Sequence, residues 1–332
     1  MLTYILKRLM WSVAVVILVA FVIFLTIRVI PGDPARLIAA GGATPETIAA
    51  LRAEMGLDKP LLVQFRDYLT GVVHGDLGTS IFRSKGGSAH SGLHNFVTAT
   101  ERTGVEDYQK AKVLDLIVER IPYTLLLTGL AMVFVVVISF SLGILSVLKK
   151  NTIWDQMVLL IAIGAQALPN FWVGIVLILL VSVKWKLLPA MGYEGPAYAI
   201  LPALVLSLSL IPLWLRQIRL GLADILSANF ITGLRARGIP NRLILFKHAL
   251  RSIAIPLVTV FGIHLGYILG GAIIVEFVFD YPGLGLLTIV AMLQRDFPVV
   301  QGIVLVFASV FVLINIGVDI VYGFIDPRVS LE

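Results

Sequence analysis

The chain has 332 residues, of which 58% are hydrophobic and 14% are charged, with a mean hydropathy of +0.97. A soluble domain usually has roughly 45–50% apolar and about 25% charged residues. This composition therefore excludes a soluble enzyme, a disordered protein and a nucleic-acid-binding protein, despite a net charge of +6. The absence of cysteine excludes disulfides, thiolate catalysis and cysteine-ligated metals.

Six stretches without Asp, Glu, Lys or Arg are long enough to cross a bilayer, which takes roughly 20 mainly apolar residues as helix. They are residues 9–27, 121–148, 156–183, 195–215, 252–275 and 297–318. Because lipid requires backbone polar groups to be paired within their segment, we predict an all-α membrane protein with six transmembrane helices. No small-residue cleavage site follows the first stretch, so we expect a retained helix rather than a signal peptide.

Lysine and arginine indicate the orientation of the helices. Lys7 and Arg8 precede the first stretch, Lys149 and Lys150 follow the second, and residues 216–251 carry seven cations against one acid. By the positive-inside rule these regions are cytoplasmic, so we expect both termini in the cytoplasm.

The stretches divide the chain into three parts. We assign residues 1–30 to the cytoplasmic N-terminus and first helix, 31–120 to an external segment, and 121–332 to a five-helix transmembrane core with a cytoplasmic loop at 216–251. In the external segment, Thr44 is a candidate N-cap for a helix with Pro45 at its first position.

Residues 84–112 of the external segment are polar and show weak apolar periodicity. They are an inert external loop or, alternatively, a lid or docking element for an external partner. His90 and His94 have a spacing that could hold a metal on a helix, but the residues between them are poor helix formers, so a metal site is disfavoured.

The cytoplasmic loop at 216–251 is too polar to span a bilayer. It predicts short helices separated by Gly238-Ile239-Pro240, with Asn241 as a candidate N-cap and an apolar stripe formed by Leu243, Ile244, Phe246 and Leu250. Its cations could lie on anionic membrane lipid or could dock a cytoplasmic protein.

Several residues inside the spans carry a structural prediction. His264 is the titratable group in the middle of a span, and we expect it to bond to a neighbouring helix rather than to relay protons. Pro169, Pro202, Pro212 and Pro256 predict bends or hinges. Gly262, Gly266 and Gly270 recur every fourth residue and predict close packing of another helix.

The chain lacks a nucleotide-binding loop. No segment fits G-x-x-x-x-G-K-[ST], the pattern that cradles phosphates. If a nucleotide powers this protein, another chain must bind it.

Motifs in five segments resemble one known family. They are the first helix followed by Pro31-Gly32-Asp33-Pro34; Gly56-Leu57-Asp58-Lys59-Pro60, Gln64-Phe65 and Gly75-Asp76-Leu77-Gly78-Thr79-Ser80; Arg235-Ala236-Arg237-Gly238 with His248-Ala249-Leu250-Arg251 and Pro256; Tyr281-Pro282-Gly283-Leu284-Gly285 with Arg295-Asp296-Phe297-Pro298-Val299-Val300-Gln301-Gly302; and Asp326-Pro327-Arg328. In this order they cover nearly the whole chain, which resembles the B-type membrane permease subunit of dipeptide, oligopeptide and nickel ABC importers.

The resemblance implies a type I ABC importer in the cytoplasmic membrane of a bacterium or archaeon. A second homologous permease subunit would complete a heterodimer, two cytoplasmic ATPase subunits would hydrolyse ATP, and an external solute-binding protein would deliver di- or oligopeptides. The chain itself would not be an enzyme and would hold no cofactor or metal. The ATPase-coupling residues that the resemblance implies are Arg235, Arg237, Gly238, Ile239, Pro240 and Phe246.

The chain departs from the family at two places. Thr232, Gly233 and Leu234 stand where the family generally has Glu-Ala-Ala or, in this branch, Arg-Thr-Ala, and residues 84–112 look like an insertion. The alternative functions are import of nickel or a metal chelate by the same architecture, and, in a different class, ion-coupled secondary transport. The latter requires buried acids, of which the spans offer almost none.

Overall fold

The computed structural model describes residues 2–29, 35, 44–54, 56–84 and 110–325, which form helices and one two-stranded sheet. The chain divides into two compact units. The N-terminal unit comprises Ile5–Ile121 and Leu287–Val310, and the core unit comprises Met1–Tyr4, Pro122–Leu286 and Phe311–Glu332.

Aromatic contacts between two helices organise the N-terminal unit. Its elements begin with α1 (Leu2–Val29), α3 (Pro45–Glu54), α4 (Leu61–Val73), β1 (Thr79–Ser84) and β2 (Lys110–Lys112). The ring centroid of Phe65 on α4 lies 5.1 Å from that of Phe21 and 5.4 Å from that of Phe24, both on α1. The predicted start of α3 is confirmed, since the backbone N–H of Thr47 donates to Thr44 Oγ1 at 3.4 Å.

The two strands pair at the ends of the predicted insertion. β1 and β2 are antiparallel, with Thr79 opposite Lys112 and Ser84 opposite Lys110. The residues between the strands lie outside the described part of the chain, and so do His90 and His94.

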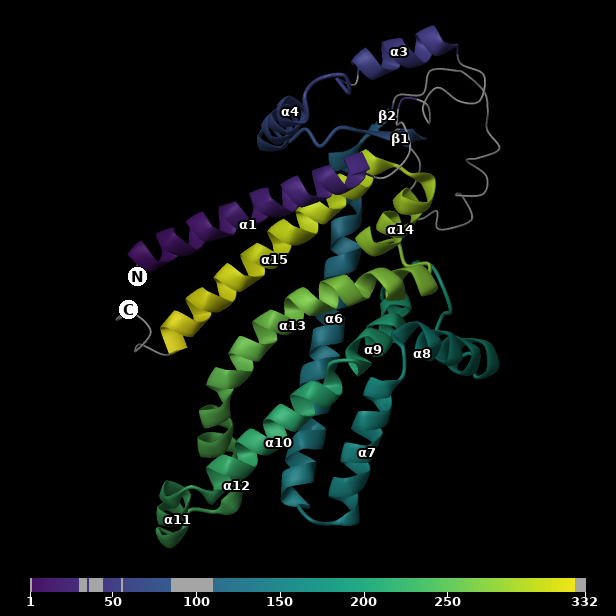
Figure 1. The fold of residues 1–332 in the computed structure, drawn as a ribbon. Coiled ribbons are helices and arrows are strands. Elements are labelled where there is room, and N and C mark those ends of the chain that lie inside the picture. Colours follow the sequence, from purple (N-terminus) through teal and green to yellow (C-terminus); the bar gives the residue numbers. More distant parts are fainter. Residues whose placement is uncertain (1, 30–34, 36–43, 55, 85–109, 326–332) are drawn as a thin grey trace. The chain divides into compact units, whose positions relative to one another are not determined.

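The remaining elements belong wholly or partly to the core unit. They are α6 (Val113–Leu148), α7 (Ile153–Ala167), α8 (Asn170–Leu177), η2 (Ile178–Lys184), η3 (Pro196–Ala199), α9 (Ile200–Leu208), α10 (Ile211–Ser227), α11 (Asn229–Ala236), α12 (Asn241–Leu243), η4 (Ile244–Ala249), α13 (Leu250–Val278), α14 (Leu284–Gln294) and α15 (Phe297–Ile325). Figure 1 shows that α11 and α12 lie at the same end of the core unit as the turn between α6 and α7.

Four of the predicted spans are continuous helices in the described part of the chain, namely α1, α6, α13 and α15. The other two are each broken into a bent pair, so that the described residues contain six spans if each pair counts as one. The pair Ile153–Ala167 and Asn170–Lys184 is bent by 104°, and the pair Pro196–Leu208 and Ile211–Ser227 by 57°.

Proline explains where the two spans break. Pro169 precedes α8 as its N-cap residue, and Pro212 lies in the first turn of α10. A proline tolerates the first turn of a helix but cannot continue a preceding one, because it lacks an N–H and its ring clashes with the previous turn. Pro256 lies inside α13, which remains one helix. Pro202 likewise lies inside α9. Two of the four predicted prolines, Pro169 and Pro212, therefore mark the breaks in the bent spans.

The buried apolar side chains of the core unit gather around α9 and α10. Leu206, Leu210, Trp214, Ile218 and Leu222 are each at most 2% exposed and belong to one cluster with residues of α6 and α13. By contrast, α7 exposes large apolar side chains such as Leu160 (72%). Such exposure suits a helix whose surroundings are lipid.

Candidate functional site

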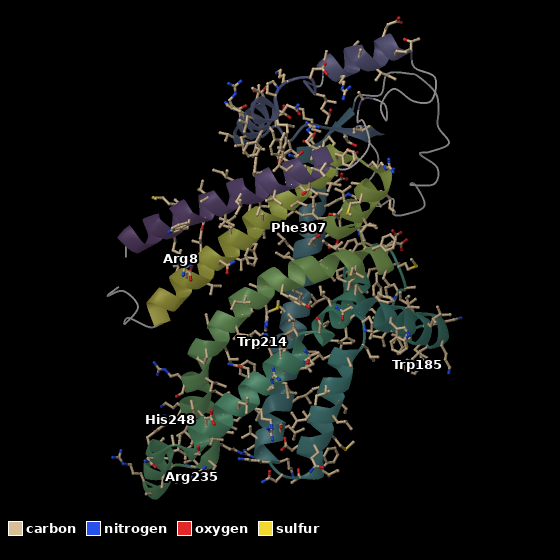
Figure 2. All side chains as sticks on the ribbon, in the orientation of Figure 1. Arg8, Trp185, Trp214, Arg235, His248 and Phe307 are labelled. Carbon is tan, nitrogen blue, oxygen red and sulfur yellow. The ribbon has the colours of Figure 1, made fainter. Side chains whose placement is uncertain are left out.

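The chain segment after α10 forms an exposed tip, defined here as α11, α12 and η4. Of the six predicted coupling residues, Arg235, Arg237, Gly238, Pro240 and Phe246 are exposed, and Ile239 is half-buried. The structure thus brings all six to one short surface region. In Figure 2 the labelled Arg235 and His248 both lie at this end of the core unit.

A glycine turn joins α11 to α12. The backbone N–H of Gly238 donates to the carbonyl of Arg235 at 2.9 Å, and that of Ile239 donates to the carbonyl of Leu234 at 3.2 Å. This pair of hydrogen bonds is a Schellman motif, which ends a helix with a residue in the left-handed region. Gly238 supplies that residue, with φ +78°, and glycine adopts it without a steric cost.

The helix after the turn begins one residue earlier than predicted. Pro240, not Asn241, is the N-cap residue of α12, and it makes no side-chain capping hydrogen bond. Asn241 is the first helical residue, and its Oδ1 accepts a hydrogen bond of 3.4 Å from Arg235 Nε. The predicted cap is therefore wrong, and the amide instead links the two sides of the turn.

The predicted apolar stripe is also wrong, because η4 is a π-helix. The wider i→i+5 turn places Ile244, Leu245 and Ala249 in the interior, where each is at most 4% exposed. Phe246 is 61% exposed and Leu243 is 45% exposed. The π-helix thus anchors the tip with one set of apolar residues and presents another to the surroundings.

The surface of the tip is basic. Exposed cations on the tip and beside it include Arg235, Arg237, Arg242, Lys247 and Arg251. The one acid in residues 216–251 is Asp224 on α10. A positive surface with projecting apolar side chains suits recognition of another protein that offers carboxylates and an apolar groove.

A buried ion pair joins the middle of α10 to the first turn of α7. Arg219 donates from Nε to Asp155 Oδ1 at 3.0 Å and from Nη2 to Asp155 Oδ2 at 2.9 Å. Asp155 belongs to the first turn of α7 and is 3% exposed. Ser146, near the end of α6, also donates to Asp155 Oδ1. Three helices therefore meet at one carboxylate.

Two family descriptions match the chain over most of its length. "Binding-protein-dependent transport system inner membrane component" matches residues 136–331, and the N-terminal membrane component of the same transport systems matches residues 1–128. The chain is 35% identical over 332 residues to the glutathione transport system permease protein GsiC of Salmonella typhimurium, covering 100% of both proteins. The GsiC protein of Escherichia coli K12 is 34% identical over the same length.

The chain belongs to the membrane permease subunits of the peptide and nickel ABC importers.

Its fold also matches a solved importer. The MetNI methionine ABC transporter in an inward-facing conformation superposes with a TM-score of 0.56, covering 64% of this chain and 97% of that one. At 19% identity this likeness concerns the fold alone. The permease therefore has the type I importer transmembrane fold that was predicted.

The family motif at residues 281–285 surrounds the carboxylate of a buried acid, Glu276, which the sequence analysis missed. Glu276 near the end of α13 is 0% exposed. Its Oε2 accepts hydrogen bonds from the backbone N–H groups of Gly285 at 2.6 Å and Leu286 at 3.2 Å, at the start of α14. Thr124 on α6 donates to its Oε1 at 2.7 Å.

The glycines of that motif leave room for the carboxylate. A Cβ at Gly283 would lie 2.3 Å from Glu276 Oε1, and a Cβ at Gly285 would lie 2.8 Å from Oε2. The search for charge-free stretches excluded Glu276 from the fifth stretch, because this residue directly follows the last position of that stretch. Glu276 is thus a buried acid of a span, where the sequence predicted almost none, and it stabilises the N-terminus of α14.

Two other family motifs meet in the N-terminal unit. Asp296 is 0% exposed and accepts hydrogen bonds from the hydroxyl of Ser80 and, at 3.2 Å, from the backbone N–H of Ile81. Gly302 on α15 would place a Cβ 2.6 Å from Val113 Cγ1. The two family motifs at 75–80 and 295–302 are therefore in direct contact, through Ser80 with Asp296, and Leu77 Cδ1 lies 3.6 Å from the Cβ position of Gly302.

The predictions for α13 are confirmed in most respects. Trp214 Nε1 donates to His264 Nδ1 at 2.7 Å, so the histidine is bonded to a neighbouring helix as predicted. A Cβ at Gly262 would lie 2.2 Å from Val318 Cγ2, and one at Gly266 would lie 2.2 Å from ring atoms of Phe311. Gly270 has nothing within 4 Å of its Cβ position. Close packing thus involves two of the three glycines.

Proposed function

We propose that the chain forms half of the translocation path of an ATP-driven importer for short peptides. The full-length 35% identity to a glutathione permease carries this proposal. Glutathione is itself a tripeptide, so it falls within the predicted substrate class of di- and oligopeptides. Specificity would reside largely in an external solute-binding protein that delivers the peptide.

The exposed tip is the proposed contact with a cytoplasmic ATPase. Its basic rim and the projecting side chain of Phe246 provide a surface for another protein, and α10 connects it directly to the membrane helices. Closure of the ATPases on ATP would push on the tip and rock the helices between inward- and outward-facing states. The six residues predicted from the resemblance, Arg235, Arg237, Gly238, Ile239, Pro240 and Phe246, are the proposed contacts.

The remaining partners and the orientation follow from the same proposal. A second homologous permease would complete the path, and two ATPases would lie on the cytoplasmic side with both termini of this chain. The clusters of Lys and Arg in residues 1–8, 149–150 and 216–251 support this orientation in a bacterial inner membrane. The segment 31–120 would then face outside, with its insertion at 84–112.

Reconstituted transport tests the proposal. The permease would be assembled with its partner permease, ATPases and binding protein in proteoliposomes, and uptake of labelled glutathione, a dipeptide, a longer peptide and nickel would be measured. We expect ATP-dependent uptake of a peptide and no uptake driven by a proton or sodium gradient without ATP. Gradient-driven uptake by this chain alone would overturn the proposed energy source, and uptake of nickel alone would overturn the proposed substrate class.

A further inference from the structure

One carboxylate joins three helices at the end of the core unit that carries the tip. Arg219 on α10 donates hydrogen bonds to both carboxylate oxygens of Asp155 on α7, at 3.0 and 2.9 Å. Arg219 Nε also lies 3.0 Å from the hydroxyl oxygen of Ser146 on α6. Planar, paired hydrogen bonds of this kind fix the relative orientation of two groups as well as their distance.

The chain between α6 and α7 is folded around the same carboxylate. Asn151 lies in the left-handed region, with φ +64°, and its backbone N–H donates to Asp155 Oδ2 at 3.3 Å. Asp155 therefore accepts hydrogen bonds from the turn, from α6 and from α10. Its side chain is 5% exposed, whereas that of Arg219 is 25% exposed.

Apolar packing holds the same helices together along their length. Gly143 on α6 would place a Cβ 2.8 Å from Ile218 Cγ2, so the two backbones approach closely. Leu215 on α10 forms a buried cluster with Val158 and Ala162 on α7. The ion pair thus lies at one end of a contact that continues between the helices.

The breaks in the two bent spans separate these helices from the rest of their spans. α7 ends at Ala167, before the 104° bend, and α10 begins at Ile211, after the 57° bend. Toward the tip, α10 ends at Ser227, and the single extended residue Ala228 links it to α11. At ~1.5 Å per residue, Arg219 lies about 12 Å along the helix from Ser227, the last residue of α10. A displacement of the tip therefore reaches Arg219 across one linking residue and about two turns of α10.

We propose that Asp155 is a positioning residue that, through Arg219, makes α7 and the adjoining end of α6 move with α10 as one body when the tip is displaced. This inference rests on the proposed function, because an ATPase must displace the tip. The apolar contact alone allows the helices to slide, whereas the paired hydrogen bonds hold one register and one rotation. Motion of the tip is thereby transmitted to α7, which belongs to a different span from α10 and does not adjoin the tip in the sequence.

The test separates coupling from folding. Asp155→Asn keeps the size of the side chain and removes its charge, and it would be compared with the unaltered permease in the assembled transporter in proteoliposomes. We expect the complex to assemble and to hydrolyse ATP, while the amount of peptide transported per ATP falls about fivefold or more. The double variant Asp155→Asn/Arg219→Gln should be no worse than the single one, because the two residues act as a pair.

Asp67→Asn is the matched control. Asp67, on α4, also accepts a hydrogen bond from a cation, Lys59 at 2.9 Å, but its side chain is 41% exposed. Hydrogen bonding from Lys59 holds the pKa of Asp67 below its ordinary value. The same substitution there removes an ion pair of the N-terminal unit and should leave the transport-to-ATP ratio unchanged.

A distance measurement gives a readout independent of transport. The chain has no cysteine, so spin labels can be attached through Leu160→Cys on α7 and Leu220→Cys on α10, two exposed positions. We expect one narrow distance that is the same with and without ATP, and a broadened distribution in the Asp155→Asn background.

Three outcomes are informative. If transport and hydrolysis fall together in Asp155→Asn, with an unchanged ratio and a narrow distance, the residue is merely structural and the inference is overturned. A label distance that changes with ATP in the unaltered permease also overturns it. Absence of ATP-dependent transport by the unaltered complex would instead overturn the proposed function and, with it, the inference.

Discussion

Thr124 Oγ1 donates a hydrogen bond of 2.7 Å to Glu276 Oε1, and the same oxygen of Thr124 accepts one of 2.8 Å from the backbone N–H of Leu284. The hydroxyl therefore ties α6 both to the end of α13 and to the start of α14. Glu276 completes the arrangement by accepting from the backbone of Gly285 and Leu286. This buried network explains physically why glycine stands at positions 283 and 285, where a Cβ would lie too close to the carboxylate of Glu276.

We predict that Glu276→Ala destabilises the permease strongly. The change leaves the buried donors of Gly285 and Leu286 without their acceptor, and each such buried group costs ~1–3 kcal/mol. Glu276→Gln keeps one acceptor oxygen and should lose less. Thermal unfolding of the purified protein in detergent measures both. A melting temperature of Glu276→Ala equal to that of the unaltered protein would contradict the role of this acid.

The turn at Gly238 provides a prediction about coupling. Gly238→Val should lower substrate-stimulated ATP hydrolysis by the assembled complex while leaving membrane insertion intact. A side chain in the left-handed region costs ~1–2 kcal/mol, and a β-branched one fits worst, although the space around the Cβ position is open. Gly238→Asn should lose less activity, because asparagine tolerates that region. Equal hydrolysis by all three proteins in liposomes would show that the turn does not seat the ATPase.

Two glycines of α13 make a matched pair. Gly266→Ala should destabilise the core unit, because its Cβ would lie 2.2 Å from ring atoms of Phe311, and overpacking typically costs ~1–3 kcal/mol. Gly270→Ala should be neutral or slightly stabilising, since nothing lies within 4 Å of its Cβ position and alanine favours a helix. Melting temperatures of the two variants compare them directly, and equal values would refute close packing at Gly266.

The strand pairing makes a deletion of residues 85–109 testable. Ser84 and Lys110 are opposite each other in the antiparallel pair, so their Cα atoms are roughly 4.5–5.5 Å apart and a two-residue turn can join them. We expect replacement by Asn-Gly to leave folding and ATPase binding intact and to change transport or basal ATP hydrolysis. Purification of the complex and uptake assays measure these effects. Wild-type transport, with proteolysis that is unchanged by binding protein, would indicate an inert loop.

The sequence by itself determined the membrane class, the positions of the spans and the family. Apolar stretches long enough to cross a bilayer predict helices because lipid offers no partner for backbone groups. The spacing of Gly262 and Gly266 correctly predicted close packing of another helix. The position of His264 in the middle of a span correctly predicted a hydrogen bond to a neighbouring helix. Such properties depend on composition and on local periodicity, which a sequence displays directly.

Tertiary structure decided how distant polar residues are paired. Asp155 and Arg219 are joined in space, as are Ser80 and Asp296, and no local pattern connects their positions in the chain. The prediction of an apolar stripe from Leu243 to Leu250 was wrong for a related reason. A π-helix replaces the α-helix there, and the packing of Ile244 and Leu245 into the core selects that wider turn over the intrinsic preference for 3.6 residues per turn. Burial of a charge or a change of helical period depends on what lies opposite, and only the folded chain supplies that partner.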